Sequence, residues 1–374
     1  MSDDEQSPEG AGPVWWTIDP DIARAATLPA EAYADPRWLE RARKRVFPRT
    51  WHLIGDTDQI RLPGHCVPLT LLPGLLDEPL LLTRDKDDRL HLLSNVCTHR
   101  GALLCEEAAA LDGLRCRYHG RRFDLEGRYL SMPEFEGAES FPSPADDLPR
   151  VGFACWGKLI FASLEPAFPF GELVAEMGAR VGWLPFGQAV FDPARSRDYV
   201  VDANWALYCD NYLEGLHIPF VHVALLGALD YGAYRTEVYR WASLQVGAAA
   251  GSDVPFDIPP SSPDRGRRIA AYYWWLFPTT MINVYPWGLS INLVQPLAPD
   301  RTRVTYRTWV WEPKLLGQGA GADLDRVERE DESVVESVQR GVRSHLYRRG
   351  RYSPKRETGV HHFHRLLTRF LAQE

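Results

Sequence analysis

The sequence Cys97-Thr-His99-Arg-Gly101, followed after a short interval by Cys116-Arg-Tyr-His119-Gly120, decides how the chain is organised. Each stretch offers one thiolate and one imidazole, a combination that selects zinc or an iron–sulfur cluster among common biological metals. A Rieske [2Fe–2S] centre needs two cysteines on one iron and two histidines on the other, so each stretch can supply one ligand to each iron. The mixed spacing, C-x-H and then C-x-x-H, therefore predicts a Rieske centre. A structural zinc site is the alternative that the spacing alone does not exclude.

The composition is that of an ordinary globular protein. Of 374 residues, 45% are hydrophobic and 25% charged, and this length predicts about two to three domains. The formal net charge is −8 without a basic stripe, which argues against nucleic acid or an anionic membrane as a partner. No apolar run is long enough to span a bilayer, and the N-terminus lacks the apolar core of a secretory signal. We therefore expect a cytoplasmic protein, whose six cysteines are metal ligands or buried thiols rather than disulfides.

The first two parts of the chain differ in sequence texture. Residues 1–49 are predicted to form a tail, disordered over residues 1–13, and a helix that starts at Pro36 with Asp35 as its N-cap. Residues 50–165 contain short apolar runs separated by turn residues, which is typical of a small all-β domain. Both Cys-His stretches lie between such runs, so this part is predicted to be the Rieske domain, with its metal site on loops.

The third part, residues 166–374, begins after a proline-rich boundary. An antiparallel meander of longer strands is predicted between residues 267 and 312, followed by helices over 324–347 and 361–371. This order predicts an α+β domain in which a long helix lies across a curved sheet.

A group of ionisable residues in this third part is hard to explain as core. His217 and His222 are five apart, about 140° around an ideal helix, so they diverge unless the helix is broken. Pro219 lies between them and is predicted to supply that break, so that both imidazoles converge on one ion. Glu214, three residues before His217, would lie on the same helical face.

Two histidines need a carboxylate to form an open iron site, and the helix predicted over 324–347 offers Asp331. Asp331 falls within the apolar stripe of that helix, and an ionised carboxylate on a core-facing position costs several kcal/mol unless it is paired or bound to metal. It is therefore the candidate third ligand, with Glu330 second. The stripe consists of Val327, Val334, Val335, Val338, Val342 and Leu346. The residues predicted to face solvent are Glu328, Arg329, Glu332, Glu336 and Arg340.

Each of these residues taken singly has a simpler interpretation. A histidine near an apolar segment is usually a satisfied core or surface residue, and Asp331 would then cap a helix or pair with an arginine. We favour a metal site because an electron-transfer centre upstream needs a destination for its electrons.

Taken together, the motifs resemble those of the catalytic α subunit of Rieske non-haem iron oxygenases, from about Trp38 to the C-terminus. The stretches that resemble that family are Cys97-Thr-His99, Cys116-Arg-Tyr-His119, Asp210-Asn211…Glu214…His217…His222 and Glu330-Asp331. The resemblance implies an α+β chain with an N-terminal all-β Rieske [2Fe–2S] domain and a helix-grip (START-like) catalytic domain. It also implies a homotrimer in which each cluster serves the mononuclear iron of a neighbouring subunit.

The resemblance assigns roles by position. The implied cluster ligands are Cys97 and Cys116 on one iron and His99 and His119 on the other. The implied ligands of a mononuclear Fe(II) are His217, His222 and Asp331. Glu214 is implied to be the acidic bridge between the two centres, with Asn211 beside it as a second catalytic candidate.

Two positions bear on how this chain differs within the family. Arg121 follows Gly120 where the family usually has tryptophan, which changes the packing beside the cluster but removes no ligand. The bridge is commonly aspartate in ring-hydroxylating dioxygenases. Glu214 instead resembles the branch that oxidises choline, carnitine or glycine betaine at a carbon on or next to a quaternary nitrogen.

The expected cofactors define the expected partners. A facial triad leaves positions on Fe(II) for O₂ as co-substrate, and a Rieske cluster supplies electrons singly. The chain contains no G-x-G-x-x-G nucleotide fingerprint and no second Cys-rich cluster motif. A separate NAD(P)H-dependent reductase, with or without a ferredoxin, is therefore implied.

The leading hypothesis is a Rieske monooxygenase that hydroxylates or N-demethylates a small alkylammonium or betaine-like compound. Six aromatic residues are candidates for a cation cage, although most are expected to be core: Tyr208, Tyr212, Trp274, Trp275, Tyr285 and Trp287. The alternative enzyme is an aromatic-ring hydroxylating oxygenase with a flat apolar pocket. The alternative outside enzymes is a Rieske electron carrier or a zinc-stabilised ligand-binding module.

Overall fold

The computed structural model describes residues 17–222, 230–251, 253–322 and 324–373. The tail predicted over residues 1–13 lies outside the described residues. The first helix, α1 (Pro36–Arg45), begins as predicted, with the Asp35 side chain accepting a hydrogen bond from the backbone N–H of Arg37. None of the described helices is long and apolar enough to cross a membrane.

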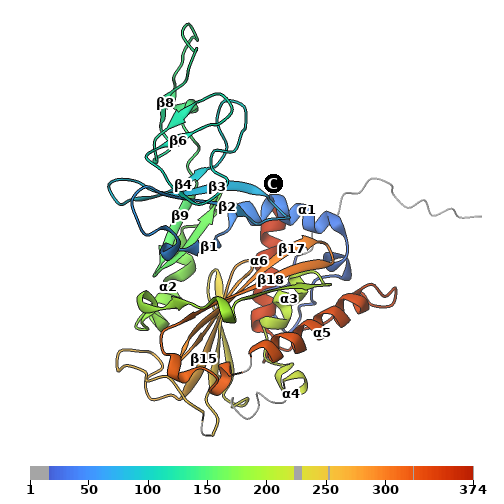
Figure 1. The fold of residues 1–374 in the computed structure, drawn as a ribbon. Coiled ribbons are helices and arrows are strands. Elements are labelled where there is room, and N and C mark those ends of the chain that lie inside the picture. The colour runs from blue at the N-terminus through green and yellow to red at the C-terminus, as the bar shows by residue number, and fades with distance from the viewer. Residues whose placement is uncertain (1–16, 223–229, 252, 323, 374) are drawn as a thin grey trace, which may run out of the picture.

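The part predicted to be a Rieske domain is built from short antiparallel strands, as expected (Figure 1). They form three small sheets, ordered β1-β10-β9, β4-β3-β2-β5 and β6-β7-β8. The strands are β1 (His52–Asp56), β2 (His65–Leu71), β3 (Glu78–Arg84), β4 (Leu90–Ser94), β5 (Ala109–Ala110), β6 (Leu114–Arg115), β7 (Arg122–Phe123), β8 (Tyr129–Ser131), β9 (Gly152–Trp156) and β10 (Leu159–Ser163). One Cys-His stretch follows β4 and the other follows β6, so both lie on loops that the sheets hold in place.

The part predicted to be a catalytic domain is one large antiparallel sheet with helices packed on it (Figure 1). The strand order is β11-β18-β17-β16-β15-β14-β13, and β12 also pairs with β18. The strands are β11 (Val190–Phe191), β12 (Arg197–Val201), β13 (Arg235–Val238), β14 (Ala242–Ala248), β15 (Ile269–Leu276), β16 (Thr280–Tyr285), β17 (Gly288–Ala298) and β18 (Arg301–Val310). The helices are α2 (Phe170–Val181), α3 (Trp205–Tyr212), α4 (Ile218–Val221), α5 (Leu324–Val342) and α6 (Thr358–Ala372). This arrangement agrees with the predicted α+β class.

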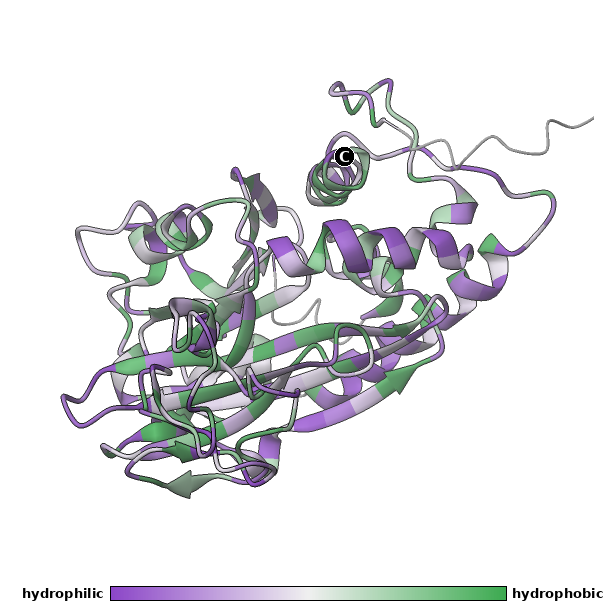
Figure 2. Ribbon diagram, turned by 90° about the horizontal axis from the view of Figure 1, so that it is seen from above, coloured by the Kyte–Doolittle hydropathy of each residue, from purple (hydrophilic) through white to green (hydrophobic). Residues whose placement is uncertain are grey.

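The sheet is the core of the catalytic domain. Every residue of β16 is buried, and Figure 2 shows long hydrophobic stretches along the strands. A tight turn joins β16 to β17, with Tyr285 paired to Gly288. Helix α6 packs Phe363 edge-on against Trp205 and Trp275, which joins the C-terminus to α3 and to the sheet.

The long helix α5 is shorter than predicted. It ends at Val342 rather than Tyr347, and Leu346 is 96% exposed instead of belonging to the apolar stripe. The physical reason is local: Ser344 turns the chain by donating its N–H to the Gly341 carbonyl and accepting, through its hydroxyl, the N–H of Leu346. Serine bonds of this kind compete with helix propagation.

Candidate metal centres

The two Cys-His turns have the same backbone geometry. Cys97 N–H donates to the carbonyl of Ala102 at 2.8 Å, and Cys116 N–H donates to that of Arg121 at 2.8 Å. In each turn the glycine four residues after the cysteine donates back to the cysteine carbonyl at 3.0 Å. Gly101 and Gly120 have φ values of 73° and 76°, which a side chain would make costly. Two equivalent turns thus present one sulfur and one imidazole each.

The side chains of these turns fit the donor set of a Rieske cluster. Cys97 and Cys116 are both buried and free of disulfides. The rings of His99 and His119 lie edge to face with centroids 4.7 Å apart. The Nδ1 atom of His119 is buried and has no hydrogen-bond partner among the described residues, an arrangement that proteins avoid unless the nitrogen serves another purpose. A Rieske cluster requires two thiolates and two imidazoles, and the two turns supply them. The unpartnered Nδ1 of His119 is available as a ligand atom.

Arg121 is a buried cation that joins the two turns. Its guanidinium donates to the Thr98 hydroxyl in the first turn at 2.7 Å and to the Asp146 carboxylate at 2.7 Å. It also lies over the rings of Tyr129 and Phe141, 5.2 and 5.4 Å from their centroids. Arg121 is 2% exposed, so little water screens its charge from the cluster ligands.

Replacing Arg121 by glutamine is expected to lower the reduction potential of the cluster. The fixed positive charge favours the extra electron of the reduced cluster, and its loss should weaken that preference about tenfold, which is about 59 mV for a one-electron couple. Potentiometric titration followed by the EPR signal of the reduced protein measures the shift. Arg122→Gln removes the same charge from an exposed neighbour and should leave the potential unchanged. Equal reduction potentials in the native chain, Arg121→Gln and Arg122→Gln would show that the charge of Arg121 does not act on a cluster in these turns.

His217 and His222 flank helix α4, one immediately before it and one immediately after. The sequence prediction that Pro219 breaks a helix between them is wrong. Pro219 lies in the first turn of α4, where its missing N–H and fixed φ are tolerated. The chain is irregular before His217 instead, between α3 and α4, so Glu214 and His217 do not share a helical face.

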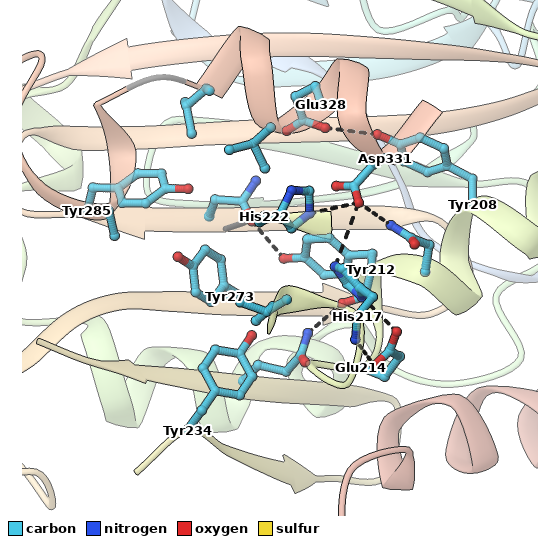
Figure 3. Close-up of a pocket in the computed structure, with 17 residues that line it drawn as sticks. Tyr208, Tyr212, Glu214, His217, His222, Tyr234, Tyr273, Tyr285, Glu328 and Asp331 are labelled. Atoms are coloured by element: carbon cyan, nitrogen blue, oxygen red, sulfur yellow. Dashed lines mark hydrogen bonds and ion pairs between the residues drawn. The ribbon is translucent and has the colours of Figure 1, made fainter. Parts of the chain in front are cut away.

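Asp331 on α5 meets both histidines (Figure 3). Its Oδ1 lies 2.9 Å from Nε2 of His222 and 3.7 Å from Nε2 of His217. One ligand atom from each of the three residues lies within 4.8 Å of the others, so a single ion can be held between them. Two imidazoles and one carboxylate match the donor set of a non-haem Fe(II) site with open positions.

Each of the three residues has a hydrogen-bond partner outside the group, which contacts the outer nitrogen of each histidine and, for Asp331, the oxygen that faces the histidines. Glu214 Oε1 lies 2.6 Å from Nδ1 of His217, and Glu330 Oε2 lies 2.8 Å from Nδ1 of His222. The amide of Asn211 donates to Asp331 at 2.7 Å. Such partners fix the tautomer and orientation of metal-binding histidines. Glu330, the second-ranked candidate ligand, therefore contacts the outer nitrogen of His222 rather than the space between the histidines.

Burial and the neighbouring carboxylates shift the pKa of His222 in opposite directions. Burial lowers the pKa of His222, but the hydrogen bonds to Asp331 and Glu330 outweigh burial and raise it above its ordinary value. The hydrogen bond to His222, with help from Arg326, holds the pKa of Glu330 below its ordinary value. Glu330 is thus an ionised partner that keeps His222 in place.

A cavity opens beside this site and is lined mainly by tyrosines and acidic or amide groups (Figure 3). Its tyrosines are Tyr208, Tyr212, Tyr234, Tyr273 and Tyr285. Three of the six predicted cage residues are among them. The tryptophans are not: Trp274 and Trp275 are fully buried core, and Trp287 faces an adjoining cavity. Tyr234 and Tyr273 were not predicted.

Glu328 corrects a second expectation. It was predicted to face solvent, but it lines the cavity and accepts hydrogen bonds from Tyr306 at 2.6 Å and Tyr208 at 3.0 Å. Burial and the charge of Asp331 raise the pKa of Glu328 to about 7. The spacing alone contained this signal, because a residue three before Asp331 lies on the same helical face.

Comparison with known proteins gives two family matches. Residues 50–142 match the Rieske [2Fe-2S] domain, and residues 190–373 match the ring hydroxylating alpha subunit catalytic domain.

Curated relatives match over most of their length. The chloroplastic choline monooxygenase of Arabidopsis thaliana is 33% identical over 374 residues, covering 94% of this chain and 84% of the relative. The carnitine monooxygenase oxygenase subunit of Escherichia coli K12 is 28% identical over 359 residues, covering 92% and 93%.

Solved structures share the fold. A quaternary ammonium Rieske monooxygenase in complex with L-carnitine superposes with a TM-score of 0.72 at 21% identity, covering 94% of this chain and 97% of that one. Naphthalene 1,2-dioxygenase from a Rhodococcus species superposes with a TM-score of 0.71 at 18% identity, covering 92% and 93%.

Proposed function

This chain belongs to the Rieske non-haem iron oxygenases, and from that premise we propose that it oxidises a small quaternary ammonium compound at a carbon on or next to the nitrogen. The enzyme class brings with it a [2Fe–2S] cluster, a mononuclear iron and electrons from a separate reductase. The substrate class and the residue roles are our proposal. We assign Cys97, His99, Cys116 and His119 to the cluster, and His217, His222 and Asp331 to the iron.

The lining of the cavity is the observation that supports a cationic substrate. Five tyrosine side chains and the carboxylates of Glu214, Glu328 and Asp331 border it, and no lysine or arginine is among its described lining residues. Tyrosine faces and carboxylates attract an alkylammonium ion, whereas a flat hydrocarbon gains nothing from buried charge. The relatives named for choline and carnitine support the same substrate class.

The reaction is balanced as follows. One atom of O₂ is inserted into a C–H bond of the substrate to give an alcohol. The other atom is reduced to water, which consumes two electrons and two protons. On an N-methyl group this alcohol collapses to formaldehyde and the amine, which is N-demethylation. Iron bound by the triad supplies the activation of O₂.

The protein residues position the reactants. Glu214 and Glu330 hold the imidazoles, and Asn211 fixes the Asp331 carboxylate by its hydrogen bond. The tyrosines exclude water around the substrate and orient its cationic end.

We also propose a homotrimer in which electrons pass between chains. Figure 1 shows β6 and helix α4 at opposite ends of the molecule. Cys116 directly follows β6, and the iron-site histidines flank α4. Each end also exposes an aromatic residue, Tyr118 at 61% and Phe220 at 79%, which suits burial against another copy. Sedimentation equilibrium should give the mass of a trimer; a fully active monomer would contradict this assembly.

The substrate proposal is tested by reductant-driven O₂ uptake with a panel of ammonium compounds and aromatic acids. We expect uptake, with an aldehyde or formaldehyde as product, only from ammonium compounds. A cis-diol or phenol from an aromatic acid, with no turnover of ammonium compounds, would favour ring hydroxylation. Unchanged O₂ uptake and iron content in His217→Ala would favour a protein without a catalytic iron.

A further inference from the structure

Glu328 is a partly buried carboxylate whose hydrogen-bond donors among the described residues are all neutral. Three neutral groups donate to it: Tyr306 at 2.6 Å, Tyr208 at 3.0 Å and, weakly, Asn292 at 3.4 Å. Among the described residues it forms no ion pair with lysine, arginine or histidine. The charge of Asp331, also on α5, is negative and raises the pKa of Glu328. A cation placed beside Glu328 would therefore stabilise its ionised carboxylate.

Glu328 lies where a substrate would bind. Glu328 lines the cavity beside the iron site and also an adjoining cavity, so a molecule entering either meets its carboxylate. The iron-side cavity also contains Glu214, a carboxylate outside the proposed iron ligands. Glu328 and Glu214 attract a cationic group and repel an anionic group that lies beside them.

The arginines of the adjoining cavity are already engaged. Arg195 pairs with Asp192 at 2.7 Å, and Arg197 lies 3.6 Å from Asp325. Each arginine therefore already has an acidic partner that offsets part of its charge, which weakens its attraction for a substrate carboxylate. The described lining residues of the iron-side cavity include no lysine or arginine that could pair with a substrate carboxylate.

We propose that Glu328 is the counter-ion of the substrate's ammonium group and that it selects cations without a carboxylate, such as amino alcohols, over zwitterionic betaines. This inference rests on the proposed function and narrows its substrate class. Glu328 is a specificity-determining residue and not an iron ligand. His217, His222 and Asp331 keep the roles proposed above.

The test is equilibrium binding by calorimetry to the iron-loaded protein without O₂. The probes are choline, glycine betaine and the neutral isostere 3,3-dimethylbutan-1-ol. The native chain should bind choline at least tenfold more tightly than either of the others. Glu328→Gln should abolish the preference for choline over the neutral alcohol, and Glu328→Asp should retain part of it.

A matched control is available on the same helix. Glu332 is partly buried, burial likewise raises its pKa to about 7, and it lines neither cavity. Glu332→Gln should therefore keep the native preference. An unchanged preference in Glu328→Gln, or a loss of equal size in Glu332→Gln, would overturn the inference.

The two proposals fail differently. Tight binding and oxidation of glycine betaine by the native chain would overturn the selection against carboxylates and leave the proposed function standing. If none of the ammonium compounds binds or is oxidised, both are overturned. The comparison of choline with betaine and with the neutral alcohol uses the native chain, so it tests the selection even if Glu328→Gln fails to fold. Glu328→Asp then tests the part of Glu328, and an unchanged preference in that variant would overturn it.

Discussion

Replacing Asp331 by alanine is expected to remove the mononuclear iron and abolish substrate oxidation while the Rieske cluster remains. The Asp331 carboxylate is the only charged donor among the three converging ligand atoms, and without it two neutral imidazoles remain to bind the ion. The iron content should fall by about one ion per chain. The EPR signal of the reduced cluster should keep its intensity, because the Cys-His turns belong to another domain.

Glu330→Gln is the matched variant for this prediction, since Glu330 is the adjacent carboxylate and contacts the outer nitrogen of His222. It should retain the iron with a weaker affinity, by about 10–100-fold as for other outer partners of metal-binding histidines. The opposite result, iron lost from Glu330→Gln and retained by Asp331→Ala, would show that Glu330 is the ligand.

Replacing Glu214 by glutamine should lower kcat by about 10–100-fold without loss of either metal centre. Glu214 Oε1 lies 2.6 Å from Nδ1 of His217, and its other oxygen accepts the backbone N–H groups of Leu216 and His217. The glutamine keeps the size of the side chain but removes the negative charge that orients the imidazole. In a mixture of pre-reduced protein, substrate and O₂, the cluster should be reoxidised more slowly.

The same measurement on Glu330→Gln separates two roles for an outer carboxylate. If Glu214 is the bridge between the centres, reoxidation of the cluster slows in Glu214→Gln and not in Glu330→Gln when both hold equal iron. Equal rates in the two variants would mean that Glu214 only orients His217.

The candidate ligands could be named from the sequence because metal chemistry restricts residue type and spacing. Cys97, His99, Cys116 and His119 are unusual as a set, and a carboxylate on an apolar stripe identified Asp331. The structure brings Asp331 to the two histidines as expected. The role of Pro219 could not be predicted in the same way, because a proline both interrupts one helix and begins the next.

The cavity lining was harder to predict because it depends on the sheet. Strand β15 has the sequence Ile-Ala-Ala-Tyr-Tyr-Trp-Trp-Leu, which is apolar throughout and hides the alternation of its faces. Tyr273 faces the cavity, whereas the hydroxyl of Tyr272 donates to Asp264 on the other side. Tyr234 reaches the cavity from a loop whose position the sequence does not predict. Glu328 was missed because a charged residue was assumed to face solvent.

A single-turnover experiment tests the central claim, that the Cys-His centre delivers electrons to the His217, His222 and Asp331 site for oxidation of an alkylammonium ion. Protein reduced at the cluster in advance, loaded with iron and separated from reductant is mixed with O₂ and choline. We predict that the EPR signal of the reduced cluster disappears as the oxidised product appears. Neither change should occur in Asp331→Ala. Reoxidation of the cluster at the same rate with and without choline, and with no product, would contradict the account.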